Sequence, residues 1–423
     1  MKEDLLHYLW KNKLIISKQL ETTHKNKIQI ISTGSHNHNS GPDFFNAQIR
    51  IKDQLWAGNV EIHVKSSDWY IHGHEKDSNY DAVILHVVWD HDLEVFRKDN
   101  SPIPTLQLKN YVNKDVLLNY QRLFSSSQKW INCENDIHSI DKFSLNNWLE
   151  RLYVERLEQK SELIQSILNA SKNDWEAVLF KMLCKNFGLM INGEAFLNLA
   201  DSIDFSVVRK ERYNLLSIEA LLYGQGALLN DDIQDGYYQK LQKEYNYLQK
   251  KYQLVPIAKS QIQFFRLRPN NFPTIRLAQL SNLFHFYQNL FSKIMAITHL
   301  KDFYKLFDIS VSPFWKTHYS FTSPSKKTNK KLTKSFIDLL LINTIIPLQF
   351  MYLKQTHNLN EEKLFSTIKQ IKPEKNTITE KFKTLNVDSI NALDSQALLQ
   401  LKNEYCTKQN CLQCIVGHKI LRC

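Results

Sequence analysis

The chain has 423 residues and a formal net charge of +11, with a pI near 9.1. This length is enough for two or three domains that each bury a core, and the charge favours a polyanionic partner. The sequence has no Gly-rich P-loop with its Lys-Ser/Thr pair, which disfavours a nucleotide hydrolase of that class. Composition alone does not distinguish DNA, RNA and a ribosome as the partner.

The first residues, MKEDLLHYLWKNKLIISK, have the apolar spacing of an amphipathic helix. Acidic residues at positions 3 and 4 and the lack of a small-residue cleavage site argue against a secretion signal. We therefore expect a cytoplasmic protein.

Two strands are predicted next. Residues 45–52 (FNAQIRIK) alternate apolar and polar side chains, and residues 55–65 (LWAGNVEIHVK) do the same after a short turn. On the second strand, Glu61, His63 and Lys65 share one face, because successive side chains point to opposite faces. This face is either a functional surface or simply solvated.

Asp43 lies just before the first of these strands, so a hairpin between them brings it close to Glu61. Two converging carboxylates suit Mg²⁺ or Mn²⁺, which prefer oxygen ligands. Such an ion activates water and offsets charge on a phosphate. The alternative is that Gly-Pro-Asp forms an ordinary turn before two amphipathic strands.

This arrangement resembles the PD-(D/E)XK nuclease superfamily, whose signature places Pro-Asp at the start of one strand and Glu-x-Lys on the next. Pro42, Asp43 and Glu61 match this signature. His63 occupies the usual lysine position, and Lys65 lies one pleat further along the same face. The resemblance implies a restriction-endonuclease-like α/β domain, with Asp43 and Glu61 binding Mg²⁺. It implies catalytic roles for His63 and Lys65 in handling water or phosphate.

Histidines are dense in the segment that follows. His72 and His74, in a polar loop, are candidate contacts to nucleic-acid phosphate or a metal, and solvated loop histidines are the alternative. Residues 80–89 (YDAVILHVVW) have the composition of a strand that is buried on both faces. His86 is therefore expected to be a core histidine with a hydrogen-bonded neighbour.

The blocks GPDF, VEIH, SDW, HGH and LHVV are together similar to those of an uncharacterised bacterial protein family. The similarity extends along most of the chain, including RLRPNNFP and the cysteine-rich end. It implies a shared architecture along this length, but it does not imply a reaction.

Strand patterns end near Trp130, and helical periodicity begins after Ser144 with an apolar stripe along LNNWLERLYVERLEQKSELIQSIL. We expect an α+β chain with a nuclease-like domain at residues 1–130. A mainly α-helical domain is expected at residues 140–423, and its last part, residues 405–423, is a cysteine-rich tail.

One apolar stretch, from Phe336 to Leu353, approaches membrane-spanning length. Asp338, Asn343 and Gln349 lie within it, and charged or amide groups are costly at bilayer depth. We expect a buried helix of a soluble domain and no membrane partner.

Arg266, Arg268 and Arg276 lie among aromatic residues and prolines in FFRLRPNNFPTIR. Arginine forks fit phosphate and aromatic rings stack on bases, so these arginines are candidate nucleic-acid contacts. The alternative is a structural connector whose arginines pair with nearby acids.

The end of the sequence carries a possible metal-binding motif, made of Cys406, Cys411, Cys414, His418 and Cys423. In a cytoplasmic chain, clustered cysteines argue for metal before disulfide. Zinc held by three thiolates and a fourth local ligand would be a structural staple. An iron-sulfur cluster is the competing occupant, for which the nuclease resemblance implies Cys133 as a distant ligand. Packed cysteines without metal are the third alternative.

These features predict a metal-dependent nuclease-like protein that hydrolyses phosphodiester bonds in DNA or RNA, with the helical domain supplying nucleic-acid contacts. The alternative is a non-catalytic nucleic-acid- or ribosome-binding protein that retains the nuclease fold.

Overall fold

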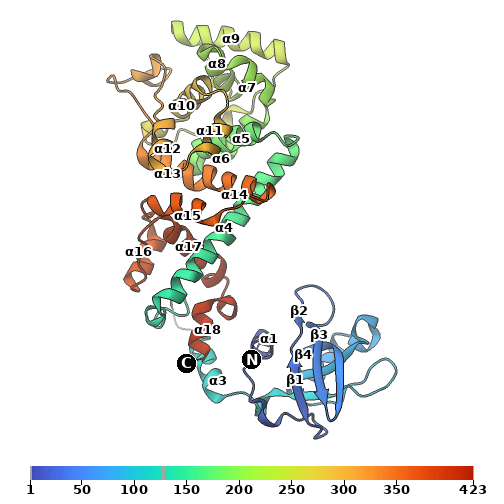
Figure 1. The fold of residues 1–423 in the computed structure, drawn as a ribbon. Helices are drawn as coiled ribbons and strands as arrows, with labels where there is room; N and C mark the ends of the chain where they lie inside the picture. Colours follow the sequence, from blue (N-terminus) through green and yellow to red (C-terminus); the bar gives the residue numbers. More distant parts are fainter. Residues whose placement is uncertain (1, 126–128, 423) are drawn as a thin grey trace. The chain divides into compact units, whose positions relative to one another are not determined.

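A mixed β-sheet organises the N-terminal part of the chain in this computed structural model, which describes residues 2–125 and 129–422 (Figure 1). Six strands form the sheet among these residues, in the order β1-β3-β4-β5-β6 with β2 paired to β3. Neighbours up to β4 are antiparallel, whereas β5 is parallel to β4 and β6 is parallel to β5. The strands are β1 (Ile28–Ser32), β2 (Ser35–His36), β3 (Phe44–Ile51), β4 (Gln54–Lys65), β5 (Val83–Asp90) and β6 (Thr105–Gln107).

The burial of each strand follows from its sequence. Along β3, Phe44, Ala47, Ile49 and Ile51 are buried, and the polar residues between Ala47 and Ile51 are exposed, as in a strand with one face on a core. The β-branched β5 is buried without alternation from Val83 to Val88, as a strand in the middle of a sheet should be. The strands predicted at 45–52, 55–65 and 80–89 thus correspond to β3, β4 and β5.

Four helices accompany the sheet in this part of the fold: α1 (Glu3–Lys11), α2 (Asp68–Ile71), α3 (Lys114–Phe124) and α18 (Ile415–Arg422). The first helix packs against β4, and its Leu5, Leu6, Leu9 and Trp10 are fully buried. Because these residues recur at helical spacing, the amphipathic pattern of the first residues is explained by this packing.

The chain divides into two compact units. The first, called the sheet unit here, comprises Met1–Trp148, Leu385–Val387 and Leu401–Cys423, and the helical unit comprises Leu149–Thr384 and Asp388–Gln400. The expectation of a mixed α+β chain is confirmed. The C-terminal segment, Leu401–Cys423, belongs to the sheet unit. Its helix α18 packs on α3, a contact between segments almost 300 residues apart that no local pattern announces.

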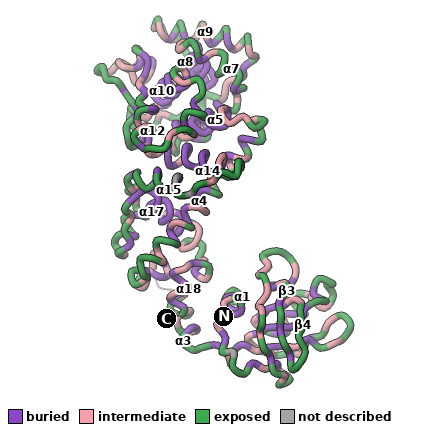
Figure 2. The backbone as a smooth tube through the Cα atoms, viewed as in Figure 1, coloured by how far each residue is buried: buried purple, intermediate pink, exposed green. Residues whose placement is uncertain are grey.

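The helical unit continues from α4 (Lys142–Ala170), which begins in the sheet unit. Its helices are α5 (Trp175–Phe187), α6 (Leu189–Asp201), α7 (Phe205–Glu211), α8 (Leu215–Gln225), α9 (Gly236–Tyr252), α10 (Pro273–Phe286), α11 (Leu290–Ala296), α12 (Leu300–Leu306), α13 (Lys334–Leu340), α14 (Ile346–Gln355), α15 (Glu361–Gln370), α16 (Thr377–Thr384) and α17 (Ala392–Gln400). A small hairpin of β7 (His318–Ser320) and β8 (Ser323–Pro324) accompanies them. Helix α10 is buried along most of its length and packs against α8 and α5 (Figure 2).

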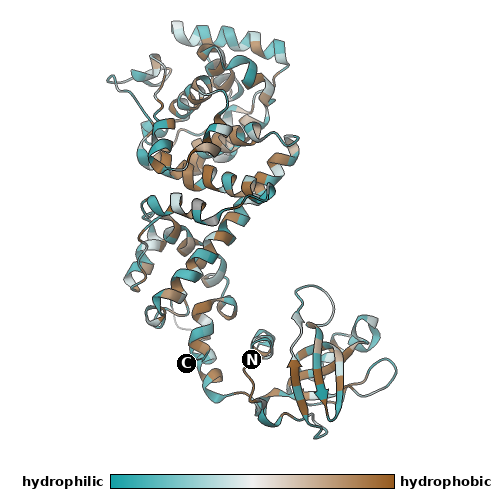
Figure 3. Ribbon diagram, in the orientation of Figure 1, coloured by the Kyte–Doolittle hydropathy of each residue, from teal (hydrophilic) through white to brown (hydrophobic). Residues whose placement is uncertain are grey.

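One helical stretch, Lys334–Gln355, is long and apolar enough to cross a membrane by length and composition (Figure 3). A five-residue π-helical segment, Leu341–Ile345, joins α13 to α14 within it. Two thirds of its apolar window is buried inside the structure, as is usual for a core helix of a soluble protein. The burial therefore agrees with the expected core helix.

Candidate active site and metal-binding residues

Asp43 and Glu61 lie on neighbouring strands and are tied together through the backbone. The N–H of Asp43 donates to Oε2 of Glu61 at 3.1 Å, and the N–H of Ile62 donates to Oδ2 of Asp43 at 2.9 Å. Glu61 is only 5% exposed, so burial raises its pKa, and the neighbouring Asp43 carboxylate acts in the same direction. The structure thus brings together the two carboxylates that the hairpin was expected to join.

Local backbone geometry sets the position of Asp43. Strand β3 pairs with β4 through Phe44 and Val60, and again through Ala47 and Gly58. Between these two pairs β3 has one residue more than β4, which makes a β-bulge. Asn46, inside the bulge, has a φ of +57°. Gly41, two residues before Asp43, has a φ of +99°, a backbone conformation that favours glycine because residues with a Cβ rarely adopt it. The bulge and this turn aim Asp43 toward β4.

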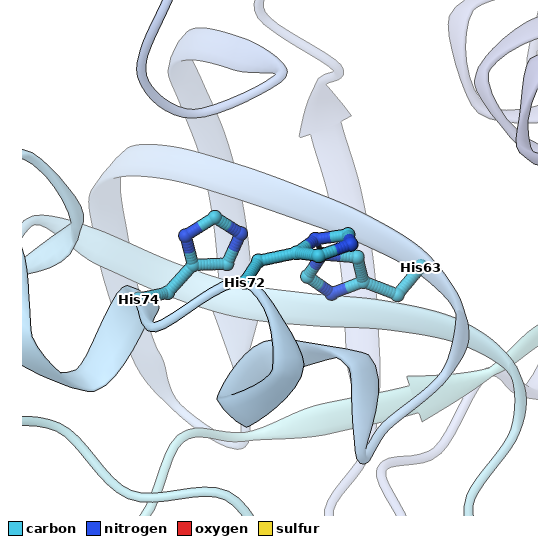
Figure 4. A group of neighbouring side chains, drawn as sticks. All are labelled: His63, His72 and His74. Carbon is cyan, nitrogen blue, oxygen red and sulfur yellow. Dashed lines mark hydrogen bonds between the residues drawn. The ribbon is translucent and has the colours of Figure 1, made fainter.

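The other carboxylate oxygen of Glu61 faces imidazoles. Oε1 lies 3.3 Å from Nε2 of His74 and 3.5 Å from Nε2 of His63. Nε2 of His63 is in turn 3.1 Å from Nδ1 of His72. The three rings gather from β4 and from the loop after α2, and one ligand nitrogen of each lies within 4.8 Å of the others (Figure 4). One carboxylate and three imidazoles therefore converge.

His86 supports this cluster from the neighbouring strand. In the parallel pairing of β4 and β5, Glu61 is opposite His86, and Nε2 of His86 lies 2.8 Å from Nδ1 of His63. As expected for a core histidine, His86 is fully buried and hydrogen-bonded to a neighbour. Burial, reinforced by nearby histidines, lowers the pKa of His63 to about 2 and that of His86 to about 3. Both rings are therefore neutral near pH 7, the form in which imidazole binds metal.

Helix α1 adds two residues that the sequence analysis did not select. Nε2 of His7 lies 3.2 Å from Oδ2 of Asp43. Burial acts to lower the pKa of His7, but its hydrogen bond to Asp43 and the charges of Asp43, Glu3 and Asp4 together outweigh this and raise the pKa. Burial raises the pKa of Glu3 to about 7, with help from the charges of Asp43 and Glu61 and against the effect of His7. The available signal was the i, i+4 spacing, which places Glu3 and His7 on one face of the helix.

Lys65 lies outside the cluster. It is exposed at the end of β4, where its backbone N–H donates to Oδ2 of Asp68 at 2.9 Å. Its ammonium makes no ion pair among the residues that the structure describes, so it is free to meet a ligand. The polar face predicted for β4 is therefore buried at Glu61 and His63 and open at Lys65.

The three arginines of the helical unit differ in exposure. Arg266 and Arg268 are exposed, beside Phe265, which is 75% exposed. Arg276 is buried: it donates to Gln279 at 2.9 Å and to Asn271 at 2.6 Å. Its guanidinium also lies 3.6 Å from the ring centre of Phe336.

A nucleic-acid contact from Arg276 does not fit this position. The arginine lies on α10, which is covered on nearly all sides, and its guanidinium bonds to the side chains of Asn271 and Gln279. Arg266 and Arg268 remain as the exposed pair of the predicted arginine interface.

Four cysteines of the sheet unit line one pocket. Cys133 lies beside the tail residues Cys406, Cys411 and Cys414, and Asn132 Nδ2 donates to Sγ of Cys411 at 3.5 Å. His418, the expected fourth ligand, is absent from the lining of this pocket and instead packs its ring on Tyr8. Cys423, the other expected ligand, lies outside the described residues.

Comparisons with known proteins identify a family. A family model described as "Protein of unknown function (DUF2851)" matches residues 3–377 of the chain. No curated protein and no solved structure matches the chain. The match covers the sheet unit through β6 and α3 and most of the helical unit, so the candidate site lies inside the matched region.

Proposed function

The chain belongs to the DUF2851 family, and from this premise we propose that its sheet unit is a metal-dependent nuclease that hydrolyses phosphodiester bonds in nucleic acid. The observation that carries the proposal is the pair Asp43 and Glu61, whose carboxylates are held together by reciprocal backbone hydrogen bonds. A cluster of imidazoles and an exposed lysine lie on the same strand or next to it.

We also propose a restriction-endonuclease-like fold for this unit. Support comes from the element order, in which α1 precedes an antiparallel set of strands that continues into the parallel β5 and β6. Further support comes from the position of the motif, since Pro42 and Asp43 directly precede β3 and Glu61 and His63 lie on β4.

The residues divide the work as follows. Asp43 and Glu61 would hold a divalent cation, which when bound supplies positive charge against the phosphate and an acidified water. Lys65, exposed at the strand end, would contact the scissile phosphate and offset its charge. His63 cannot replace a lysine as a cation, because its pKa is far below 7. The attacking water would add to phosphorus and lose a proton to solvent, while the bond to the leaving oxygen would break and that oxygen would take up a proton from solvent.

The donor chemistry favours Mn²⁺ over Mg²⁺ at this site. Mg²⁺ takes oxygen ligands almost alone, whereas here imidazole nitrogens lie 3.3 and 3.5 Å from the same Glu61 carboxylate. Oδ2 of Asp43 and Oε2 of Glu61 already accept backbone hydrogen bonds, so their other oxygens and remaining lone pairs are the ones left for a cation.

The test is cleavage of a labelled panel of single- and double-stranded DNA and RNA at fixed salt, with Mg²⁺ or Mn²⁺. Asp43→Ala should reduce cleavage to background while nucleic-acid binding persists. Asp53→Ala is the matched control, because Asp53 is an exposed aspartate in the turn at the other end of the same hairpin. Cleavage that survives in Asp43→Ala would remove this site assignment.

One observation favours the second candidate, a nucleic-acid- or ribosome-binding protein without catalysis. The usual lysine position holds His63, which is 1% exposed and engaged by His86. Binding without cleavage across the whole panel, with either metal, would make this candidate the better one.

A further inference from the structure

We propose that Glu61, His63, His72 and His74 form a binding site for one transition-metal ion of the zinc type, distinct in chemistry from a magnesium site. The four donors come from β4 and from the loop that follows α2. Imidazole nitrogens suit Zn²⁺, Co²⁺, Ni²⁺ and Fe²⁺, whereas Mg²⁺ is held by oxygens and water.

The separations between donors fit a single small ion. An ion with bonds of about 2.0–2.1 Å to four tetrahedral ligands keeps those ligands about 3.3 Å apart. The pairs His63–His72, His63–Glu61 and His74–Glu61 are separated by 3.1, 3.5 and 3.3 Å. Nε2 of His74 is buried without a well-aligned hydrogen bond, although Oε1 of Glu61 lies 3.3 Å away, and such a polar atom gains from a ligand.

His86 completes the arrangement as a positioning residue. When the proton of His63 is on Nδ1, Nε2 of His86 accepts it at 2.8 Å, and the Nε2 lone pair of His63 faces the cluster. Histidine ligands of metal ions usually donate their second ring N–H in this way, which fixes the tautomer and the ring orientation. Gly73, with a φ of +71°, turns the chain between the other two imidazoles so that both face inward.

The ion would contact Oε1 of Glu61, while Oε2 is bound to the backbone of Asp43. A role for this ion as a cofactor rests on the proposed nuclease function. Its binding is nevertheless measured without substrate. If the protein binds the ion but cleaves no nucleic acid, the metal site is supported and the proposed nuclease function is rejected.

The experiment is metal analysis of the full chain after chelation and dialysis against Zn²⁺ or Co²⁺ in excess Mg²⁺. His72→Ala and His74→Ala should each lose one equivalent of bound metal relative to the parent, together with the visible bands of tetrahedral Co²⁺. His72 is exposed, so its replacement spares the core. His24→Ala is the matched control. Exposed His24 lies 3.3 Å from one carboxylate oxygen of Glu94 and His91 lies 3.4 Å from the other, so these two imidazoles meet different oxygens, whereas those of His63 and His74 share Oε1 of Glu61. Metal content unchanged in both cluster variants, or retention of Mg²⁺ in preference to Zn²⁺, would overturn the proposal.

Discussion

Oε2 of Glu61 accepts the backbone N–H of Asp43, while Oδ2 of Asp43 accepts the N–H of the residue that follows Glu61. Each carboxylate is therefore positioned by the strand that carries the other. Substitution of either residue removes a hydrogen bond from its partner's strand as well as its own charge. Effects of the two substitutions on a measured activity should accordingly be non-additive, as for residues that act as a unit.

His86→Gln should weaken zinc binding about 10- to 100-fold while leaving the ligands themselves in place. The reason is that His86 orients His63 through a 2.8 Å hydrogen bond, and glutamine lacks a nitrogen at the same position. Competition with a chelator of known affinity measures the change. Far-ultraviolet circular dichroism checks the fold, and an affinity equal to that of the parent in a folded variant would exclude a positioning role.

Arg266→Ala combined with Arg268→Ala should lower nucleic-acid affinity and reduce the dependence of affinity on salt. The log–log slope should fall by about one unit for each phosphate that an arginine no longer neutralises. Both arginines are exposed and free to meet a phosphate backbone. A salt titration of binding measures the slope. An unchanged slope would assign the proposed phosphate-binding role to another surface.

Arg276→Ala should behave in the opposite way. It removes two charge-assisted hydrogen bonds, to Asn271 and Gln279, and the packing of the guanidinium on the ring of Phe336, so it should cost on the order of 3 kcal/mol of unfolding free energy. The salt slope of binding should stay at the parent value. Denaturant unfolding and the same salt titration test both statements together.

Glu219→Gln should change how stability depends on pH. Burial raises the pKa of Glu219 from 4.5 to about 7, against hydrogen bonds from Tyr237 and Ser312. Between pH 4.5 and 7 the folded chain therefore holds a proton that the unfolded chain has released, and stability falls as pH rises through this window. Above pH 7 the decrease is complete, and it amounts to about 3 kcal/mol at most, since one pKa unit corresponds to about 1.4 kcal/mol.

The glutamine variant cannot ionise, so its stability relative to the parent should be higher at pH 8 than at pH 4.5. Denaturant unfolding at the two pH values measures this difference. Glu162→Gln, at an exposed position on α4, is the control and should show no such change. A parent and variant that differ equally at both pH values would mean that Glu219 keeps an ordinary pKa in the folded protein.

Gly58→Ala should destabilise the sheet unit by about 1–3 kcal/mol. A Cβ there would lie 2.5 Å from Cγ2 of Ile84 and 2.7 Å from the carbonyl oxygen of Ala82, and the backbone oxygen cannot move aside without shifting β5. Gly236→Ala is the control, because nothing lies within 4 Å of its Cβ position. Denaturant midpoints of the two variants that move equally would contradict this account.

The alternation of β4 was enough to place Glu61 and His63 on one face, since side-chain direction is a local property of a strand. The hydrogen bond between His63 and His86 was not accessible in the same way. It depends on the register of β4 against β5, which opposes Glu61 and His86 across an intervening loop and helix. Registers between strands joined by long connections are fixed by packing of the whole sheet.

Arg276 shows a second limit of prediction from the sequence. Its segment has the composition of an exposed basic connector, but α10 is buried on nearly every side, so its sequence lacks the polar stripe that marks a surface helix. The position of Cys133 beside the tail has a similar cause, because nearly 280 residues separate it from Cys411 and only tertiary structure joins them.

The division of the sheet unit has a consequence for synthesis of the protein. A ribosome makes the strands and α3 first, then all of the helical unit, and only then residues 401–422, which complete the packing on α3 and the cysteine pocket. The sheet unit, which would be the catalytic unit of the proposed nuclease, is thus started before the helical unit and completed after it. A chain interrupted anywhere in the helical unit would leave an incomplete sheet unit, so translation itself delays the assembly of that unit until the helical unit has been made.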